Sequence, residues 1–435
     1  MAPKADRAQV GVGLLGVGVV GAAVAGAILQ AAPPDRGLRL AAALVRDTSR
    51  PRGVTLPGRV LSTDPERVLD NPDIDIVVEV MGGEQPAFDY MARALRSGKH
   101  VVTANKDVIA RRGEELRAMA ADRGVSIQYE ASVGGGIPII GPLLDDLSAN
   151  RILGLRAIIN GTTNYILTRM ASGRVSFDDA LGEAQSLGYA EADPTADVDA
   201  FDAVYKIAIL TRLAFGVAVP VDSIYREGIR RTQAEDFRYA AELGYTIKLL
   251  AVARREDGGL LVRVHPALVP TAVPMAKVEG VLNVVEAEGD LVGPLWLQGR
   301  GAGAEATASA VMGDVLRAAR IVRGGGGLPA ARPVDDTLRL LPMDEHECKY
   351  YLRLAALDRP GVLASIAGVL GELQISIAAV IQMDADAERG TADLVIMTHP
   401  AREANMQKAL DRMAGLDVVD SVANLIRVEF YPEEA

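Results

Sequence analysis

The first long apolar stretch, Val10 to Leu29, contains twenty residues without a charge and six glycines. Its length suffices for a membrane-spanning helix, and Lys4 and Arg7 precede it as in a signal peptide. The glycines, however, divide it into an apolar run, a turn GVGVVG and a small-residue run. This order is typical of a buried strand, a tight turn and a helix. We therefore expect a βα unit here and no membrane segment.

The turn has the spacing GxGxxG of a dinucleotide-binding loop. Gly16 permits the tight turn, Gly18 lets a pyrophosphate approach the backbone, and Gly21 lets the helix lie close to the strand. The N-terminus of the helix, at Val19, presents unpaired N–H groups and a positive dipole to phosphates. The pattern predicts a Rossmann-type domain.

Further apolar runs at Leu38–Val45, Ile74–Val80 and His100–Thr103 predict parallel strands, with helices over Pro86–Ser97 and Glu114–Arg123 between or after them. In an open parallel sheet, ligands bind at the carboxyl ends of the strands. The TANK sequence places Thr103 and Lys106 there. A surface lysine that opens the next helix is the alternative interpretation.

In a Rossmann fold, the residue at the end of the second strand contacts the 2′ position of the cofactor's ribose. Arg46 precedes Asp47 at that point, and Arg50 and Arg52 follow. An acidic residue favours NAD, whereas an arginine accommodates the 2′-phosphate of NADP. The excess of arginines favours NADP, but NAD remains open.

The sequence SIQYEASVGGGIPII predicts a further strand, which a glycine-rich stretch interrupts just after Glu130. Such a backbone can turn its carbonyl groups around a hard cation beside one carboxylate. A plain turn from strand to helix explains it equally well.

The most acidic part of the chain lies between Asn160 and Lys206. Glu191 to Asp197 reads as a loop, broken by Pro194. From about Val198 the apolar residues recur at helical spacing, which places Asp202 and Lys206 on one face of a helix. Taken alone, this pair is equally an ordinary ion pair on a solvated helix.

The pattern over residues 151–302 predicts an α+β domain with a mixed sheet and helices on one face. This domain could also make subunit contacts. A strand is expected over Ile152–Asn160, followed by short alternating strands between Ser223 and Gln298. A second glycine turn at Gly303 precedes a small-residue helix over about 303–320, which we expect to return to the first domain, residues 1–150.

The last part of the chain predicts a separate module. Residues 321–348 contain GGGG and several prolines, as linkers do. Residues 349–435 then have the order βαββαβ of a ferredoxin-like domain.

Composition narrows the possible partners. The net charge of −11 and pI near 5.1 argue against nucleic acid and anionic membrane, because both would repel the protein. The single cysteine, Cys348, permits no internal disulfide, and the four histidines lack ligand-like spacing. We expect a reducing, cytoplasmic location and no zinc site.

Seven motifs, in this order, resemble the homoserine dehydrogenases: GVGVVG, VVEVMGG, TANK, YEASVGGGIPII, NGTTNYIL, the run from Ala184 to Lys206, and GAGAEATASAV. The sequence LDRPGVLASIAGVL resembles the opening of an ACT regulatory domain. One position departs from the family pattern: Ala200 stands where that pattern has glycine.

The resemblance implies interconversion of L-homoserine and L-aspartate 4-semialdehyde with NADP or NAD, on the pathway to threonine, methionine and isoleucine. Lys206 matches the proton donor, which Asp202 would orient, and Lys106 lies at the junction of cofactor and substrate. Glu191 and Asp197 match residues that hold the substrate's ammonium group. Implied cofactor positions are Gly16, Gly18, Val19, Gly21, Arg46, Thr103, Lys106 and Gly303; the implied ligands of a monovalent cation, Na⁺ or K⁺, are Glu130, Val133, Gly135 and Ile137.

Two other functions stay open. One is a dehydrogenase of a different amino-acid semialdehyde, although Cys348 lies outside any nucleotide-binding context and is not placed to act as a catalytic thiol. The other is a non-catalytic sensor of nucleotide and amino acid, against which the intact Lys106, Asp202 and Lys206 argue.

The ACT-like module implies a regulatory effector, with threonine favoured because it is an end product, and a homodimer or homotetramer. A dimerisation module without a ligand is the alternative. Because the module reads as separate, a chain ending near Arg323 is expected to remain active and to lose its response to threonine.

Overall fold

The computed structural model describes residues 9–30, 37–173, 175–324, 327–328, 334–335, 337–386 and 390–431. Part of the predicted linker, including Gly325 and Gly326, lies outside these residues. The chain forms two compact units, each from three segments. The first comprises Met1–Leu153, Tyr205–Ser223 and Val285–Asp335; the second comprises Gly154–Val204, Ile224–Val284 and Asp336–Ala435.

The first unit contains a six-stranded parallel sheet in the order β3-β2-β1-β4-β5-β6. This is the strand order of a Rossmann fold, as predicted. The strands are buried on both faces, which explains their continuous apolar sequences. Their bounds are β1 Val10–Leu15, β2 Leu38–Leu44, β3 Leu61–Ser62, β4 Ile76–Glu79, β5 His100–Thr103 and β6 Ile127–Gln128.

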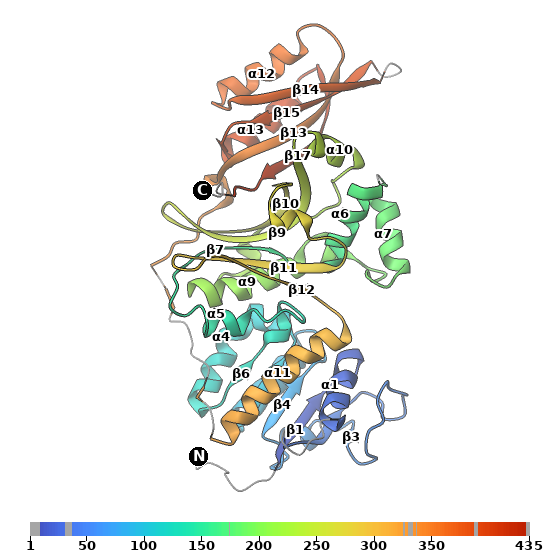
Figure 1. The fold of residues 1–435 in the computed structure, drawn as a ribbon, viewed down its shortest axis with the longest axis vertical. Helices are drawn as coiled ribbons and strands as arrows, with labels where there is room; N and C mark the ends of the chain where they lie inside the picture. The colour runs from blue at the N-terminus through green and yellow to red at the C-terminus, as the bar shows by residue number, and fades with distance from the viewer. Residues whose placement is uncertain are drawn as a thin grey trace. The chain divides into compact units, whose positions relative to one another are not determined.

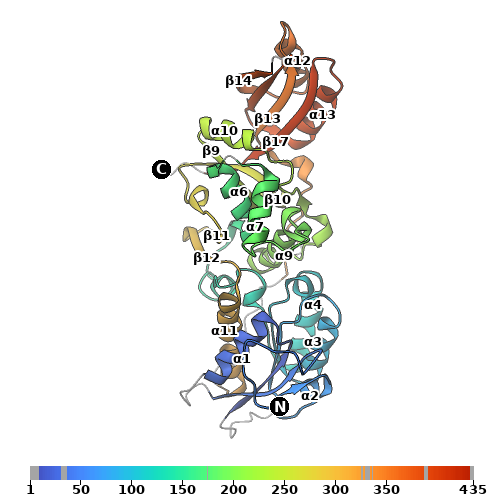
Figure 2. The same cartoon turned by 90° about the vertical axis from the view of Figure 1, so that its right-hand side faces the viewer.

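The first apolar stretch is confirmed as β1, a turn and helix α1 (Val19–Gln30). Across the described residues, no helix combines the length and apolar character needed to cross a bilayer. Figure 2 shows α3 (Ala87–Arg96) and α4 (Lys106–Arg123) together on one side of the sheet, with α1 and α11 (Ala304–Val322) on the other.

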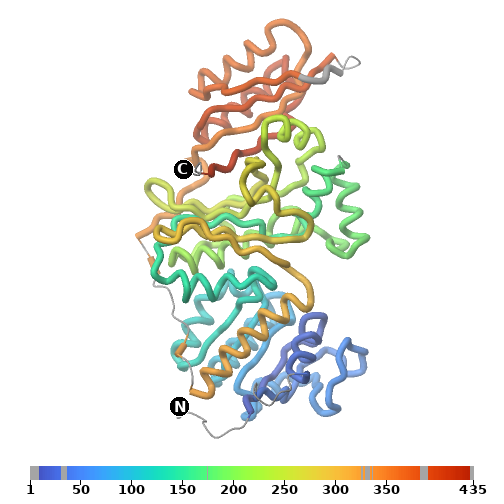
Figure 3. The backbone as a smooth tube through the Cα atoms, in the orientation of Figure 1, coloured from blue at the N-terminus to red at the C-terminus, as the bar shows by residue number. Residues whose placement is uncertain are grey.

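Helix α11 returns to the first unit from far along the sequence, as expected. Figure 3 shows it, in orange, running beside the blue α1. Its buried residues Ala308, Val311 and Met312 join the same core as Val24 and Ala25 of α1. The small side chains on both helices allow this close packing.

Two details of the first unit differ from expectation. The helix predicted over Glu114–Arg123 begins at Lys106, because Asn105 caps it by accepting a hydrogen bond from the Val108 N–H at 3.2 Å. The strand predicted through Glu130 ends at Gln128. It is followed by a 3₁₀ turn, η2 (Glu130–Ser132), and a short helix, α5 (Ile140–Leu144).

The second unit is built on one long sheet in the order β7-β9-β10-β17-β13-β15-β14. The prediction of short strands was wrong: β9 and β10 have twelve residues each and pair antiparallel along their whole length. The seven strands are β7 Ile152–Ile158, β9 Tyr245–Glu256, β10 Gly259–Pro270, β13 Glu347–Leu357, β14 Ile377–Asp386, β15 Thr391–Thr398 and β17 Val419–Val428.

Several helices complete this unit, and one continues beyond it. Helix α9 (Phe201–Phe215) begins in the second unit and ends in the first. The predicted loop from Glu191 to Asp197 contains a single helical turn, α8 (Thr195–Val198), after Pro194. The other helices are α6 Gly161–Gly173, α7 Phe177–Ser186 and α10 Ala234–Glu242. Strand β11 (Leu282–Gly289) begins in the second unit and ends in the first, to which its neighbour β12 (Gly293–Arg300) belongs.

The C-terminal module has the predicted order βαββαβ: β13, α12 (Val362–Glu372), β14, β15, α13 (Glu403–Ala414) and β17. Both helices pack on its sheet through one apolar cluster that includes Ile366, Leu370 and Met406. The fold class is therefore confirmed for all three parts.

The module is not separate, however. Strand β17 pairs in parallel with β10, at Ala267 with Arg427 and Leu268 with Val428 (Figure 1). The predicted linker is also held, because the Leu260 N–H donates to the Arg339 carbonyl and the Leu341 N–H to the Leu260 carbonyl. A chain ending near Arg323 would lack β17 and its pairing with β10, and its expected activity stays a prediction.

Buried charges join the module to the rest of the second unit. Glu429 follows β17 and accepts hydrogen bonds from Arg156 Nε at 2.9 Å and Arg263 Nη2 at 2.7 Å. All three side chains are at most 4% exposed. Burial alone would raise the pKa of Glu429, but Arg263 and Arg156 outweigh it and hold that pKa below its ordinary value.

We predict that Glu429→Ala lowers the unfolding free energy by about 3–5 kcal/mol, because it leaves two buried guanidinium groups without their carboxylate. Glu372→Ala removes the carboxylate of an exposed pair with Arg412 and is expected to cost under about 1 kcal/mol. Denaturant unfolding at pH 7 measures both. The contribution of Glu429 is present above the unfolded-state pKa and is lost as the pH falls through the lowered folded-state pKa. Equal shifts for both variants would contradict the prediction.

Candidate functional site

The three glycines of the GxGxxG turn have three different environments. Gly16 has φ +100°, a backbone conformation that favours glycine. A Cβ on Gly21 would lie 2.2 Å from the Gly16 carbonyl oxygen, so only glycine lets α1 approach the turn. A Cβ on Gly18 would meet nothing within 4 Å, which leaves open space above the backbone. This is the arrangement that a pyrophosphate requires.

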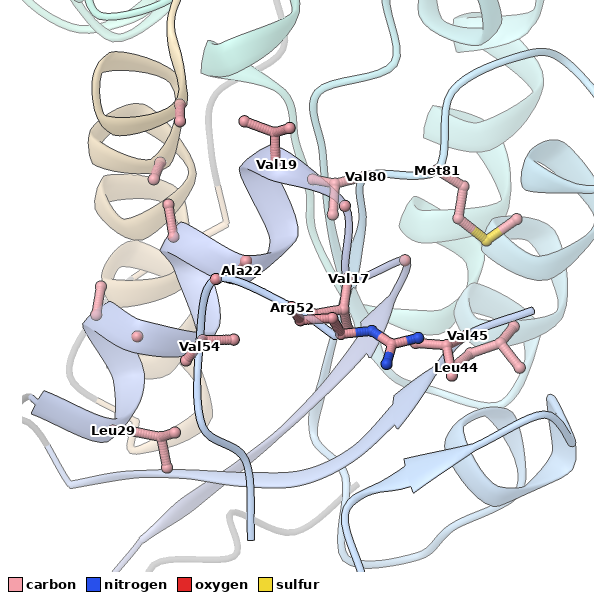
Figure 4. Close-up of a pocket in the computed structure, with 18 of the residues that line it drawn as sticks. Val17, Val19, Ala22, Leu29, Leu44, Val45, Arg52, Val54, Val80 and Met81 are labelled. Carbon is pink, nitrogen blue, oxygen red and sulfur yellow. The ribbon is translucent and has the colours of Figure 1, made fainter. Parts of the chain in front are cut away.

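A cavity of ≈1720 Å³ opens beside this turn (Figure 4). Gly16, Gly18, Val19 and Arg46 line it from the sheet side. Residues of α11 complete the wall, and most of them are small; the group comprises Ala304, Glu305, Ala308, Ser309, Met312, Gly313 and Leu316. The cavity exceeds the roughly 300–1,000 Å³ of most small-molecule sites, as a dinucleotide would need. Gly21 lies beneath the turn, and Gly303 has φ +115° immediately before α11.

The ribose end of the cavity is basic. Arg46 is exposed on its rim, and Figure 4 shows the Arg52 side chain reaching toward Val45. Two backbone carbonyls, of Arg50 at 2.6 Å and of Asp47, accept from the Arg52 guanidinium. The Asp47 carboxylate accepts from the side chain and backbone N–H of Ser49, which lower its pKa. Asp47 is thus an ionised carboxylate already engaged by Ser49.

A buried carboxylate fixes the start of α4, where Lys106 stands. Glu79, at the end of β4, accepts from the Thr103 hydroxyl at 2.6 Å and from the Met81 N–H at 2.7 Å. Burial raises the pKa of Glu79, and these donors oppose the rise. The Thr103 oxygen also accepts from the Asn105 N–H, directly before Lys106. The Thr103 side chain therefore holds Glu79 and the helix start, and it is not among the cavity-lining groups.

In the second unit, one amide connects the two predicted carboxylates. Asn160 Nδ2 donates to Asp197 Oδ1 at 2.7 Å and to Asp202 Oδ2 at 2.9 Å. Asp202 is 4% exposed, whereas Glu191 is exposed on the preceding loop. The loop is tied to α6 by the Thr162 hydroxyl, which donates to the Tyr189 carbonyl at 2.7 Å. Asp197 and Asp202 are thus brought together, and Glu191 lies apart from this bond network.

Asp202 and Lys206 both lie on α9, four residues apart, so they share one face of the helix as predicted. Lys206 is half-buried, and so is Lys106 at the start of α4. Next to Lys206, the Tyr205 hydroxyl accepts from Arg111 of α4 at 3.1 Å. This bond joins the two helices that bear the lysines, within the first unit.

Ala200 occupies a left-handed conformation with φ +64°, directly before α9. It is fully buried, and it is one of two non-glycine residues with positive φ in the described part of the chain. A side chain costs roughly 1–2 kcal/mol in this conformation. The sequence position that departs from the family's glycine is therefore a position where the backbone favours glycine.

The loop predicted to hold a cation is buried, but its carboxylate is engaged. Glu130 accepts from the backbone N–H groups of Ile139 at 2.6 Å, Ile140 at 2.7 Å and Gly141 at 2.9 Å. The main-chain oxygens of the loop are further candidate ligands for a cation. Within the described residues, no N–H donates to the carbonyl oxygens of Val133, Gly135 or Ile137, all in buried residues.

Further contacts fix the position of this loop. Gly135 has φ +58°, and a Cβ there would lie 2.2 Å from the Gly301 carbonyl oxygen. The Glu130 N–H donates to Asp314 of α11 at 2.8 Å. Burial raises the pKa of Asp314 to about 7. Around the loop, the described residues contain no cluster of three His, Cys, Asp or Glu side chains that suits a metal.

Two residues with evident roles in this geometry were missed from the sequence. Glu79 and Asn160 both stand in motifs that were recognised, VVEVMGG and NGTTNYIL. The available signal was a single polar residue at the end of an apolar strand, where burial forces it to bond to something nearby. The partner of such a residue is not identifiable from the sequence alone.

Comparison with known proteins identifies relatives along most of the chain. A family model for homoserine dehydrogenase matches residues 138–316, and one for the homoserine dehydrogenase NAD-binding domain matches residues 16–130. An ACT-domain model matches residues 350–417. The chain is 43% identical to the homoserine dehydrogenase of Synechocystis sp. over 91% of this chain and 93% of that protein. It is 41% identical to the enzyme of Neisseria gonorrhoeae over 91% of each.

Solved structures agree with these matches. The crystal structure of a homoserine dehydrogenase from Thiobacillus denitrificans has a TM-score of 0.90 and 43% identity, covering 97% of this chain and 98% of that one. A hyperthermophilic archaeal homoserine dehydrogenase in complex with NADPH has a TM-score of 0.62 and 28% identity, covering 74% of this chain and 100% of that one.

Proposed function

The chain belongs to the homoserine dehydrogenase family, and we propose that Lys206 is the acid–base residue of its reaction, with Asp202 as the carboxylate that orients it. The enzyme is an oxidoreductase that interconverts L-homoserine and L-aspartate 4-semialdehyde. When bound, the nicotinamide cofactor accepts or supplies the hydride. In the oxidation direction, Lys206 takes the hydroxyl proton as the C–H bond breaks; in reduction it returns that proton to the carbonyl oxygen.

The placement of Asp202 supports this assignment most directly. A carboxylate that is 4% exposed and bonded to Asn160 is held still, and it stands one helical turn before Lys206. An ordinary surface ion pair would leave both side chains in water. Glu191 and Asp197 supply negative charge for the substrate's ammonium group, and Lys106 stands where the cofactor and substrate meet.

The chemistry of Cys348 argues against the thiol-dependent alternative. Burial raises the pKa of this thiol to about 12, so it is not a thiolate nucleophile at neutral pH. A non-catalytic sensor would show no turnover of L-homoserine, so a turnover assay separates it from the enzyme.

Lys206→Ala is expected to lower kcat by about 10²–10⁴-fold, the usual contribution of a positioned acid or base, while leaving cofactor binding intact. Initial rates of L-homoserine oxidation, with cofactor binding followed by fluorescence, measure both quantities. Lys408→Ala, which removes an exposed lysine of the C-terminal module, serves as the matched control. A near-normal kcat for Lys206→Ala would end the assignment.

We further propose that NADP is the preferred cofactor. Arg46, Arg50 and Arg52 supply three guanidinium groups at the ribose end, and Asp47 is engaged by Ser49. The archaeal relative, by its description, binds NADPH.

Arg46→Asp should move the ratio of kcat/KM for NADP over NAD toward NAD, because a carboxylate repels the 2′-phosphate. The ratio is measured for the wild-type enzyme and for the variant under identical conditions, and the two values are compared. Arg59→Asp makes the same charge change at an exposed position outside the cavity lining and is expected to leave the ratio unchanged. If Arg46→Asp also leaves it unchanged, Arg46 does not read the ribose.

A monovalent cation, Na⁺ or K⁺, is proposed at the loop that begins at Glu130. The buried carbonyl groups of Val133, Gly135 and Ile137 fit it, because hard cations prefer oxygen ligands. The cation would hold the loop in place beside α11 and take no part in the hydride or proton transfer. Thermal stability in KCl, NaCl and choline chloride at equal ionic strength tests it; identical curves would remove the cation.

Threonine is the proposed effector of the ACT module. In this module, the turn between β13 and α12 contains Asp358, which accepts a hydrogen bond from the Gln382 side chain at 3.1 Å. The turn ends at Gly361, which has φ +92°. The continuous sheet through β17 and β10 offers a physical route from this module to the catalytic part of the second unit.

Millimolar threonine is expected to inhibit L-homoserine oxidation by the full-length enzyme, and Asp358→Ala to weaken that inhibition without altering the uninhibited rate. A coupling of roughly 1–3 kcal/mol, or 5- to 150-fold in affinity, is typical of such effects. The rates are compared with those in methionine and isoleucine. Absence of inhibition by all three would leave the module only a role in assembly.

A further inference from the structure

The side-chain amide of Asn160 has a partner for each of its polar groups. It lies between the end of β7 and the start of α6 and is 6% exposed. Its nitrogen donates to Asp197 Oδ1 and Asp202 Oδ2, and its oxygen accepts from the Thr163 N–H at 2.8 Å and the Thr163 hydroxyl at 3.0 Å. One buried amide therefore contacts α6, α8 and α9 at once.

The orientation of this amide follows from its partners. A backbone N–H can only donate, so the atom facing the Thr163 N–H must be the oxygen of Asn160. The NH₂ group then faces the two carboxylates and has one hydrogen for each. Rotation of the amide by 180° would bring oxygen against two carboxylates and NH₂ against an N–H donor. The site therefore fixes one orientation of Asn160.

We propose that Asn160 is the positioning residue of the substrate site, which holds the carboxylates of Asp197 and Asp202 as a fixed pair. This inference rests on the proposed function, in which Asp197 binds the substrate's ammonium group and Asp202 orients Lys206. Two carboxylates so close together repel each other. A shared donor offsets that repulsion and sets the direction of each carboxylate.

The surrounding contacts explain why a shared donor is needed here. Asp197 lies on the single turn α8, and Asp202 lies in the first turn of α9 beyond the left-handed Ala200. Short elements on either side of a bend do not by themselves hold two side chains in register. Asn160 follows the end of β7, and Thr162 lies on α6 and donates to the Tyr189 carbonyl of the same loop. Both bonds therefore attach the loop to a regular element of the fold.

Asn160→Asp separates this role from helix capping. Aspartate is as good an N-terminal cap as asparagine, so the bond from the Thr163 N–H is kept, while both donors to Asp197 and Asp202 are replaced by a repelling oxygen. We expect kcat/KM for L-homoserine to fall by roughly 10- to 100-fold, as when groups that orient reactive ligands are removed. The KM for L-homoserine rises, and the KM for the cofactor does not change.

Thr163→Val is the matched control. It removes the hydroxyl bond to the Asn160 oxygen and leaves the backbone bond and both carboxylate bonds. It is expected to lower thermal stability without raising the KM for L-homoserine. An equal rise in the KM for L-homoserine in Thr163→Val and Asn160→Asp would mean that Asn160 affects substrate binding only by stabilising α6. The proposal would then be withdrawn.

Asp197→Asn and Asp202→Asn, assayed beside these variants, separate this proposal from the proposed function. If both aspartate variants retain full kcat/KM, the assignment of the substrate site itself is wrong. If they lose activity while Asn160→Asp keeps wild-type KM and kcat, the site stands and only the role of Asn160 is overturned.

Discussion

A carboxylate that is taken out of water must receive hydrogen bonds or a cation, and the main junctions of this enzyme depend on that requirement. Glu79 joins the ends of β4 and β5, Glu130 caps α5, and Glu429 joins the C-terminal module to β7 and β10. For Glu79 and Glu429 the donors include side chains far away in the sequence, namely Thr103 for Glu79 and both Arg156 and Arg263 for Glu429. Loss of the Glu429 carboxylate, for example, removes hydrogen bonds from Arg156 of β7 and from Arg263 of β10 at once.

The same requirement shapes the acidic loop of the proposed substrate site. Asp197 and Asp202 are close enough to share one donor, and Asn160 supplies it from the end of a strand. A site that binds an ammonium group through carboxylates must keep those carboxylates together despite their mutual repulsion. A neutral amide meets this need, because it donates to both without adding a charge that would compete with the substrate.

The C-terminal module follows from this physics as well. A glycine-rich connection suggests a domain that folds alone, but strand pairing and buried arginines make the module part of one sheet. A ligand that shifts β17 would act on β10 directly through hydrogen bonds, and one that shifts β13 would act on β10 through β17, whereas a flexible linker would transmit little force. The effector proposed for this module would therefore act on β10 along the sheet.

The sequence by itself determined the local features. It predicted the Rossmann unit from GxGxxG, the shared helix face of Asp202 and Lys206 from their spacing, and the βαββαβ module from its periodicity, because each depends on residues close together in the chain. Ala200 could be singled out only by comparison with the family's pattern. The length of β9 and β10, the partners of Glu79 and Asn160, and the fusion of the module with the sheet were decided by the tertiary structure. Each of these depends on which distant groups meet, and a buried polar side chain shows in sequence only that it needs a partner, not which partner it finds.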